Sequence, residues 1–186
     1  MVHLTALWLP ILVSGIAVFL ASFVMHMLLR YHRSDWATVP NEDAVMDALR
    51  AVPPGDYMMP HAAGPEMMKD PAFQEKVKRG PMATLTIMPR SDMSGAFRRS
   101  LGLWFVYCLV VSLFAALVAG GEMGRAEHTH QVVHIVWLAS FMGYGLALAQ
   151  MSIWYRRKWS TTFKSLLDAL VYGLVTGLVF AWLWPR

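Results

Sequence analysis

Histidine is concentrated in residues 121–134, GEMGRAEHTHQVVH. His130 and His134 are four positions apart, so on a helix they share one face. Neutral imidazoles at this spacing can bind Zn²⁺ or Cu²⁺, and a histidine at a membrane edge can ligate the metal of a haem or chlorophyll. The predicted metal ligands are His128, His130, His134 and Glu127, and the predicted tetrapyrrole ligands are His130 and His134. The alternative is that these side chains simply meet water and lipid head groups at a helix start.

A second polar group falls inside apolar stretches and consists of His26, Tyr107, Gln150 and Asp168. At 1.5 Å per helical residue, all four would lie about 6–10 Å below the same membrane boundary. A carboxylate or imidazole at that depth is costly facing lipid, so we expect Asp168 and His26 to point inward and pair with each other. Gln150, or Arg30 reaching back, is the other possible partner. The alternative places Asp168 at the head groups, as an ordinary acid near a helix N-terminus.

Other chemistry has little support in the sequence. No GxSxG, Walker, HExxH, CxxC or dinucleotide-binding signature occurs, so we expect no enzymatic activity. The single cysteine, Cys108, excludes an intrachain disulfide and a cysteine-based zinc or iron–sulfur site. Many of the 14 methionines lie between residues 58 and 93, where an adaptable packing surface is a better explanation than copper ligation.

The elements that carry these residues are four long apolar stretches. The chain of 186 residues is 56% hydrophobic and only 15% charged, which is too apolar for a soluble domain of this size. Each stretch is long enough to cross a bilayer as a helix. The predicted spans are residues 4–29, 100–121, 131–155 and 163–184. The predicted fold is therefore an all-α membrane protein with a small, partly folded α+β insert between the first two helices. Its divisions are 1–29, 30–99 and 100–186.

Basic residues indicate the orientation. Arg30 and Arg33 follow the first apolar stretch, and the cluster at 156–158 with Lys164 flanks the turn between the last two. The turn after Gly120 has only Arg125, against Glu122 and Glu127. By the positive-inside rule the insert is cytoplasmic, and both termini are periplasmic in a multi-pass inner-membrane protein. The first stretch lacks preceding positive charge, so we expect a retained helix rather than a cleaved signal. The basic residues lie at span ends, which argues for a lipid-bilayer partner and against nucleic acid.

The insert has local folding signals. Asn41 is a candidate helix cap, and Asp70, Pro71 and Gly80 bracket a second short helix. Residues 57–59 and 83–88 are typical of extended segments. Two strands cannot stand alone in water, so we expect the insert to pack on the membrane domain's rim or on a partner.

Small residues recur every four positions in the last two spans. In lipid such stripes allow helix backbones to approach closely. They predict either a homodimer seam or a helix contact within the bundle, and they comprise Ala139, Gly143, Ala147, Ala169, Gly173, Gly177 and Ala181.

Four short sequences carry a family resemblance: GDYMMP, RGPM, RRKW and DALVYGLVTGLVFAWLWP. With them the chain resembles a family of small, uncharacterised bacterial inner-membrane proteins. The resemblance implies four spans and a bacterial inner membrane, and it implies no activity or residue role.

The function we expect from these features is non-enzymatic: an accessory, scaffold or assembly subunit of a larger respiratory or photosynthetic membrane complex. The partner would be another membrane protein or a second copy of the chain. One alternative is a metal- or tetrapyrrole-binding membrane protein with the periplasmic histidine site. A further alternative is a small transporter that acts as an oligomer.

Overall fold

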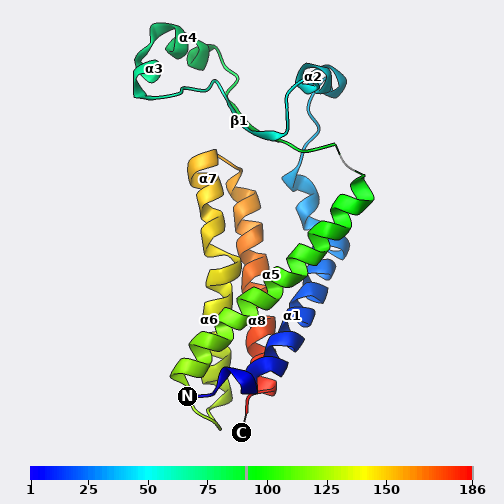
Figure 1. Ribbon diagram of the computed structural model, residues 1–186, viewed down its shortest axis with the longest axis vertical. Helices are drawn as coiled ribbons and strands as arrows, with labels where there is room; N and C mark the ends of the chain where they lie inside the picture. Colours follow the sequence, from blue (N-terminus) through cyan, green and yellow to red (C-terminus); the bar gives the residue numbers. More distant parts are fainter. Residues whose placement is uncertain (91, 186) are drawn as a thin grey trace. The chain divides into compact units, whose positions relative to one another are not determined.

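The computed structural model describes residues 1–90 and 92–185, and the chain divides into two compact units (Figure 1). The helical unit consists of Met1–Ala37 and Met93–Arg186. The insert unit consists of Thr38–Asp92. Residues 30–37 and 93–99, which we expected in the insert, therefore pack with the helices.

The helical unit contains four helices that are long and apolar enough to cross a membrane, as the sequence predicted. These are Leu4–Leu28, Met93–Glu122, Thr129–Tyr155 and Trp159–Trp182. Their segments are η1 (Leu4–Leu7), α1 (Trp8–Phe23), the π-helical turn η2 (Val24–Leu28), α5 (Met93–Glu122), α6 (Thr129–Tyr144), η4 (Leu146–Leu148), α7 (Ala149–Tyr155) and α8 (Trp159–Trp182). A short 3-10 turn, η3 (Tyr31–Asp35), follows the first helix.

Two helices differ from the predicted spans. α5 begins at Met93, so that Arg98 and Arg99 lie inside the helix rather than before it. The third span is interrupted at Gly145, between α6 and η4. A Cβ at Gly145 would lie 2.8 Å from the Cβ of Ala169 on α8, so the break coincides with a close approach of this segment to α8.

Both termini lie at the same end of the helical unit (Figure 1). The backbone N–H of Val2 donates to the carbonyl of Gly120 at 2.8 Å, and that of Ala126 donates to Pro185 at 3.2 Å. The turn between α5 and α6 is therefore held by both ends of the chain.

The interior of the helical unit includes several polar side chains, and its surface carries many large apolar ones. Ser14 and Ser112 are buried and joined by a hydrogen bond of 3.0 Å between α1 and α5. By contrast, Phe114, Leu178 and Trp182 are among many exposed large apolar side chains. This distribution is typical of helices whose outer faces meet lipid, because small and hydroxylated residues supply the close contacts between them.

The small-residue stripe on α8 is used inside the bundle. A Cβ at Gly173 would lie 2.9 Å from the carbonyl oxygen of Trp137, and one at Gly177 would lie 2.8 Å from that of Val133. Both carbonyls belong to α6, so these glycines allow α6 and α8 to touch.

The remaining stripe residues are divided between packed and exposed positions. Ala169 is buried, and Ala139 and Ala181 pack against the core. Gly143 instead faces Val111 of α5, and Ala147 is exposed.

The insert contains α2 (Glu42–Leu49), β1 (Gly55–Met59), α3 (Pro65–Lys69), α4 (Pro71–Arg79) and β2 (Ala83–Ile87). β1 and β2 pair antiparallel, with Gly55 opposite Ile87 and Met59 opposite Ala83, which confirms the predicted pair of strands. The α3 helix was not predicted.

The two predicted helix starts in the insert have different outcomes. Asp70 caps α4 by accepting from the N–H of Ala72 at 2.8 Å, as expected. The predicted side-chain cap at Asn41 is wrong. Asn41 has a left-handed backbone (φ 56°), whereas a capping side chain reaches the first N–H groups from an extended one.

Candidate functional site

The site forms where the chain leaves the first membrane-length helix. Arg30 adopts a left-handed conformation (φ 44°), and the chain then continues into η3. Lys164 of α8 donates hydrogen bonds to Tyr31 and Asp35, and these bonds hold η3 against α8. His26 lies in the π-helical turn that precedes this bend, and such widened turns often occur at functional sites.

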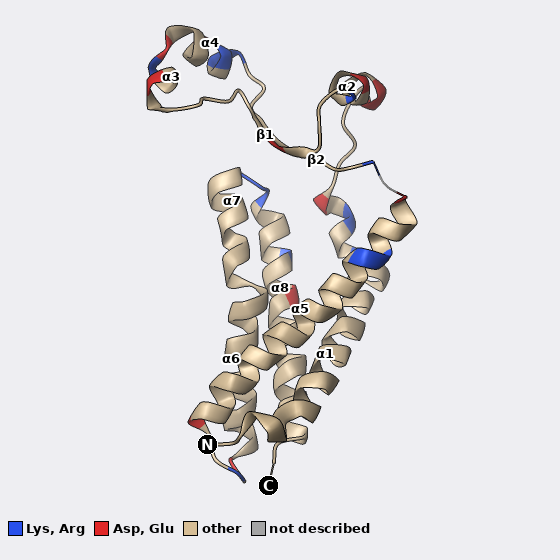
Figure 2. Cartoon of the chain, in the orientation of Figure 1, with Lys and Arg blue, Asp and Glu red and all other residues tan. Residues whose placement is uncertain are grey.

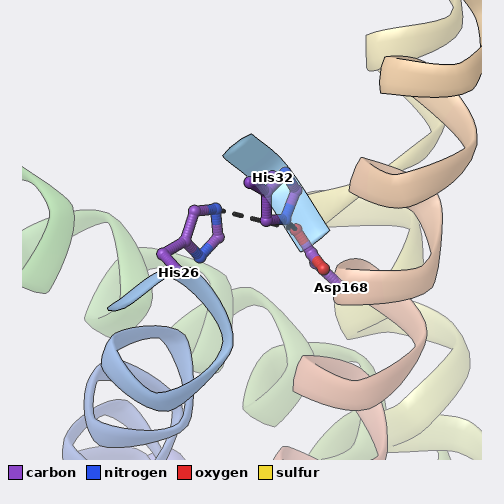
Figure 3. Close-up of side chains that lie close together, drawn as sticks. All are labelled: His26, His32 and Asp168. Atoms are coloured by element: carbon purple, nitrogen blue, oxygen red, sulfur yellow. Dashed lines mark hydrogen bonds and ion pairs between the residues drawn. The ribbon is translucent and has the colours of Figure 1, made fainter. Parts of the chain in front are cut away.

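Asp168 of α8 is the centre of the site. One carboxylate oxygen, Oδ1, accepts a hydrogen bond from the Tyr31 hydroxyl. The other, Oδ2, lies 2.9 Å from Nε2 of His32 and 3.7 Å from Nε2 of His26 (Figure 3). The side chain of Asp168 is only 6% exposed and that of His26 is 48% exposed. A buried carboxylate is thus joined to a half-exposed imidazole at its rim.

A second carboxylate supports this centre from the opposite side of the His32 ring. Oδ2 of Asp35 lies 2.7 Å from Nδ1 of His32, and Nζ of Lys164 donates to Oδ1 of Asp35 at 2.7 Å. Lys164 also donates to the carbonyl of Tyr31 at 2.7 Å. This series of side-chain contacts, from Asp168 through His32 and Asp35 to Lys164, attaches η3 to α8.

Two groups outside the membrane-length helices have shifted pKa values. Burial raises the pKa of the Asp35 carboxyl, but the hydrogen bonds from Lys164 and His32 outweigh this effect and hold it below its usual value. Burial, followed by the hydrogen bond to Asp168, raises the pKa of the Tyr31 hydroxyl. Asp35 is therefore held as a carboxylate and Tyr31 as a neutral donor.

His26 is fixed by contacts of its own. Its Nδ1 lies 3.1 Å from the carbonyl oxygen of Ser22 and 3.4 Å from the Tyr172 hydroxyl. Its ring stacks on that of His32, with centroids 4.3 Å apart. The Ser22 hydroxyl in turn accepts from the indole N–H of Trp104 at 2.8 Å, which connects the site to α5.

Two imidazoles and a carboxylate therefore converge. Within the described part of the chain, this is the one place where ligand-type atoms from three His, Cys, Asp or Glu side chains lie within 4.8 Å of one another. Groups of this kind can share protons or bind a cation.

The predicted polar layer is only partly brought together. His26 and Asp168 make the contact described above, and Asp168 is buried rather than exposed at a head-group position. Tyr107 donates to the carbonyl of Gly143 at 2.6 Å, so it reaches the site only through neighbouring aromatic rings. Gln150 is exposed on α7, beyond the break in the third span.

The predicted histidine site lies at the end of the helical unit that carries the termini. The His128 and His130 rings are 5.9 Å apart, and His134 is exposed, as are the other two. Glu127 accepts from the backbone N–H of Gly124 at 3.3 Å. A pocket of about 230 Å³ lies beside Glu127 and His128. Its lining consists of Ala126, Glu127, His128, Thr129, Val132, Ala181 and Trp184. A metal or tetrapyrrole at this end stays a prediction.

Sequence reasoning missed Tyr31, His32 and Asp35 as site residues because hydropathy falls after Leu29, which assigned them to the insert. The available signal was the spacing of His32 and Asp35, three positions apart directly after an apolar stretch. Lys164 was assigned only as part of a basic flank.

Compared with protein-family models, curated proteins and solved structures, the chain matches none of them.

Proposed function

We propose that the chain is a non-enzymatic accessory, scaffold or assembly subunit of a larger membrane complex in a bacterial inner membrane. One observation carries the proposal: none of the described residues of the insert unit is buried. The buried side chains of the described chain all belong to the helical unit. The insert thus has secondary structure without a core.

Such an insert needs a surface to pack against. A two-stranded hairpin and three short helices bury too little apolar area to be stable alone. Methionines supply much of the exposed apolar surface, with Met58, Met67 and Met82 at 49%, 44% and 62% exposure. Flexible thioether side chains adapt well to a protein surface. Acidic and basic residues are mixed in the insert, which favours a protein partner over an anionic lipid surface or nucleic acid (Figure 2).

Membrane insertion is supported by the four apolar helices and their apolar outer faces. Lys and Arg residues gather near the start of α5 and where α7 meets α8 (Figure 2). By the positive-inside rule, this distribution supports a cytoplasmic location for that end and a periplasmic location for both termini. The family resemblance in the sequence supports the bacterial inner membrane.

In this role the polar site anchors the chain. Tyr31, His32 and Asp35 attach η3 to α8 immediately before the insert begins at Thr38. A fixed anchor would limit the freedom that the insert loses when it docks on a partner.

Photo-crosslinking in cells of the source bacterium tests the proposal. A photoreactive residue is placed at Met58, Met67 or Met82 of the full chain, and a matched control is placed at Leu178, an exposed position of α8. We expect discrete adducts with one other membrane protein from the insert positions and none from the control. Adducts only with a second copy would replace the accessory role by self-association. The same adduct pattern at all four positions would contradict the proposal.

Thiol labelling tests the orientation. Ala63 is exposed in the insert, Thr129 is exposed at the start of α6, and the native Cys108 is buried. In intact cells an impermeant reagent should label Thr129→Cys and spare Ala63→Cys. The reverse pattern would place the termini in the cytoplasm.

A further inference from the structure

We infer that His26, His32 and Asp168 form a binding site for a first-row divalent metal ion, of which Zn²⁺ is the best match. The site does not depend on the proposed partner role. It is distinct from the histidines at 128–134, which lie at the end of the helical unit with the termini (Figure 1).

The ligand atoms already lie near coordination spacing. Two ligands bound to Zn²⁺ at about 2.1 Å in a tetrahedral arrangement are roughly 3.4 Å apart. Nε2 of His32 lies 2.9 Å from Oδ2 of Asp168, and Nε2 of His26 lies 3.7 Å from the same oxygen. Ligand atoms of all three side chains lie within 4.8 Å of one another, so a rotation of the stacked His26 ring would bring them around one ion.

The outer partners contact the ring nitrogens that would not bind the ion. A metal-binding histidine usually donates its other ring N–H to a carboxylate or a backbone carbonyl. Nδ1 of His32 lies 2.7 Å from Oδ2 of Asp35, and Nδ1 of His26 lies 3.1 Å from the carbonyl oxygen of Ser22. With the proton on Nδ1, the Nε2 atoms of both rings, which lie 2.9 Å and 3.7 Å from Oδ2 of Asp168, become available to an ion.

The charges at the site favour a cation. Lys164 pairs with Asp35, whose side chain is 5% exposed. The Asp168 side chain is 6% exposed and accepts a hydrogen bond from the Tyr31 hydroxyl, which carries no charge. When both imidazoles are neutral, a divalent ion supplies the positive charge that a buried carboxylate needs.

The ligand set selects the class of metal. Two imidazoles and one carboxylate suit Zn²⁺ and neighbouring first-row ions such as Fe²⁺ and Co²⁺. No thiolate belongs to the group, which disfavours Cu⁺, and one carboxylate offers too few oxygens for Ca²⁺ or Mg²⁺. Because His26 is about half exposed, an ion can enter from that side and keep an open coordination position.

The test uses the full chain with a tag free of histidine, purified in mild detergent and stripped with a chelator. Zn²⁺ binding is measured by calorimetry, and Co²⁺ binding by visible absorbance. We expect one ion per chain in the wild type. His26→Ala should weaken binding by about 10-fold to 100-fold or more, and the His26→Ala/His32→Ala double variant should abolish it.

The matched control is His130→Ala/His134→Ala, which removes the same number of imidazoles from the other end. It should bind Zn²⁺ like the wild type. Because His26 is half exposed, His26→Ala should keep the fold, and its melting curve without metal checks this. Absence of stoichiometric binding in the wild type would overturn the inference. So would undiminished binding by a folded His26→Ala variant, or loss of binding in the control alone. None of these results bears on the crosslinking test of the partner role.

Discussion

Histidines lie at both ends of the helical unit, but their surroundings differ. His128, His130 and His134 are neighbours in the sequence, and all three are exposed. His26 and His32 come from two successive turns and meet Asp168 from a helix 136 positions beyond His32. There the His32 side chain is 15% exposed and the Asp168 side chain is 6% exposed.

The comparison shows that proximity in the sequence does not by itself build a site. Successive residues of one helix point in different directions around its axis, so neighbours in the sequence share few partners. Residues from different segments that meet at a helix contact lose solvent together, and each must then find a hydrogen-bond partner. Four sets of substitutions, taken from the largest expected effect to the smallest, test this difference.

Asp168→Leu should have the largest effect. It leaves the Tyr31 hydroxyl and the His32 imidazole without their buried acceptor, and we expect a loss of about 3–5 kcal/mol in the free energy of unfolding. Asp168→Asn should cost less because an amide still accepts a hydrogen bond. Unfolding by denaturing detergent in mixed micelles measures both. Near-wild-type stability for both variants would remove the distinction between the two ends.

Gly177→Leu should follow, with a loss of about 1–3 kcal/mol or failure to pack. The added side chain would collide with the backbone of Val133, next to His134, and push α6 from α8. Gly102→Leu is the matched control, since nothing lies within 4 Å of a Cβ there. Thermal melting and size in detergent report the difference. Equal behaviour of the two variants would show that the α6–α8 contact is not tight.

Lys164→Met should lower stability by about 1–3 kcal/mol, because Asp35 and the Tyr31 carbonyl lose a charged donor. The Lys164 side chain is 22% exposed. Lys69→Met serves as the control, since its pairing with Glu66 lies in the exposed insert and should contribute little. The same unfolding assay applies. If the two lysine variants were equally stable, the anchor of η3 would depend on the imidazoles alone.

His130→Ala and His134→Ala should have the smallest effects, within about 0.5 kcal/mol in metal-free buffer, because both side chains are exposed. Chemical unfolding of each variant beside the wild type measures this. A larger loss would mean that the histidines near the termini stabilise the bundle.

The sequence alone determined much of the fold. Runs of apolar residues long enough to cross a bilayer predicted the four helices, because the need to satisfy backbone groups in lipid is a local requirement. The strand pair and the cap at Asp70 were also predicted, since alternation and capping act within a few residues. The small-residue stripes indicated close helix packing and left open which helices would meet.

Only the tertiary structure decided the rest. It brought His32 and Asp35 onto α8, interrupted the third span at Gly145, and paired the α8 glycines with α6. Hydropathy assigns each residue to a segment from its neighbours, so it placed His32 in the insert and left Lys164 as a simple flank. Their roles depend on a bend after the first helix and on where two distant segments touch, and a local pattern contains neither.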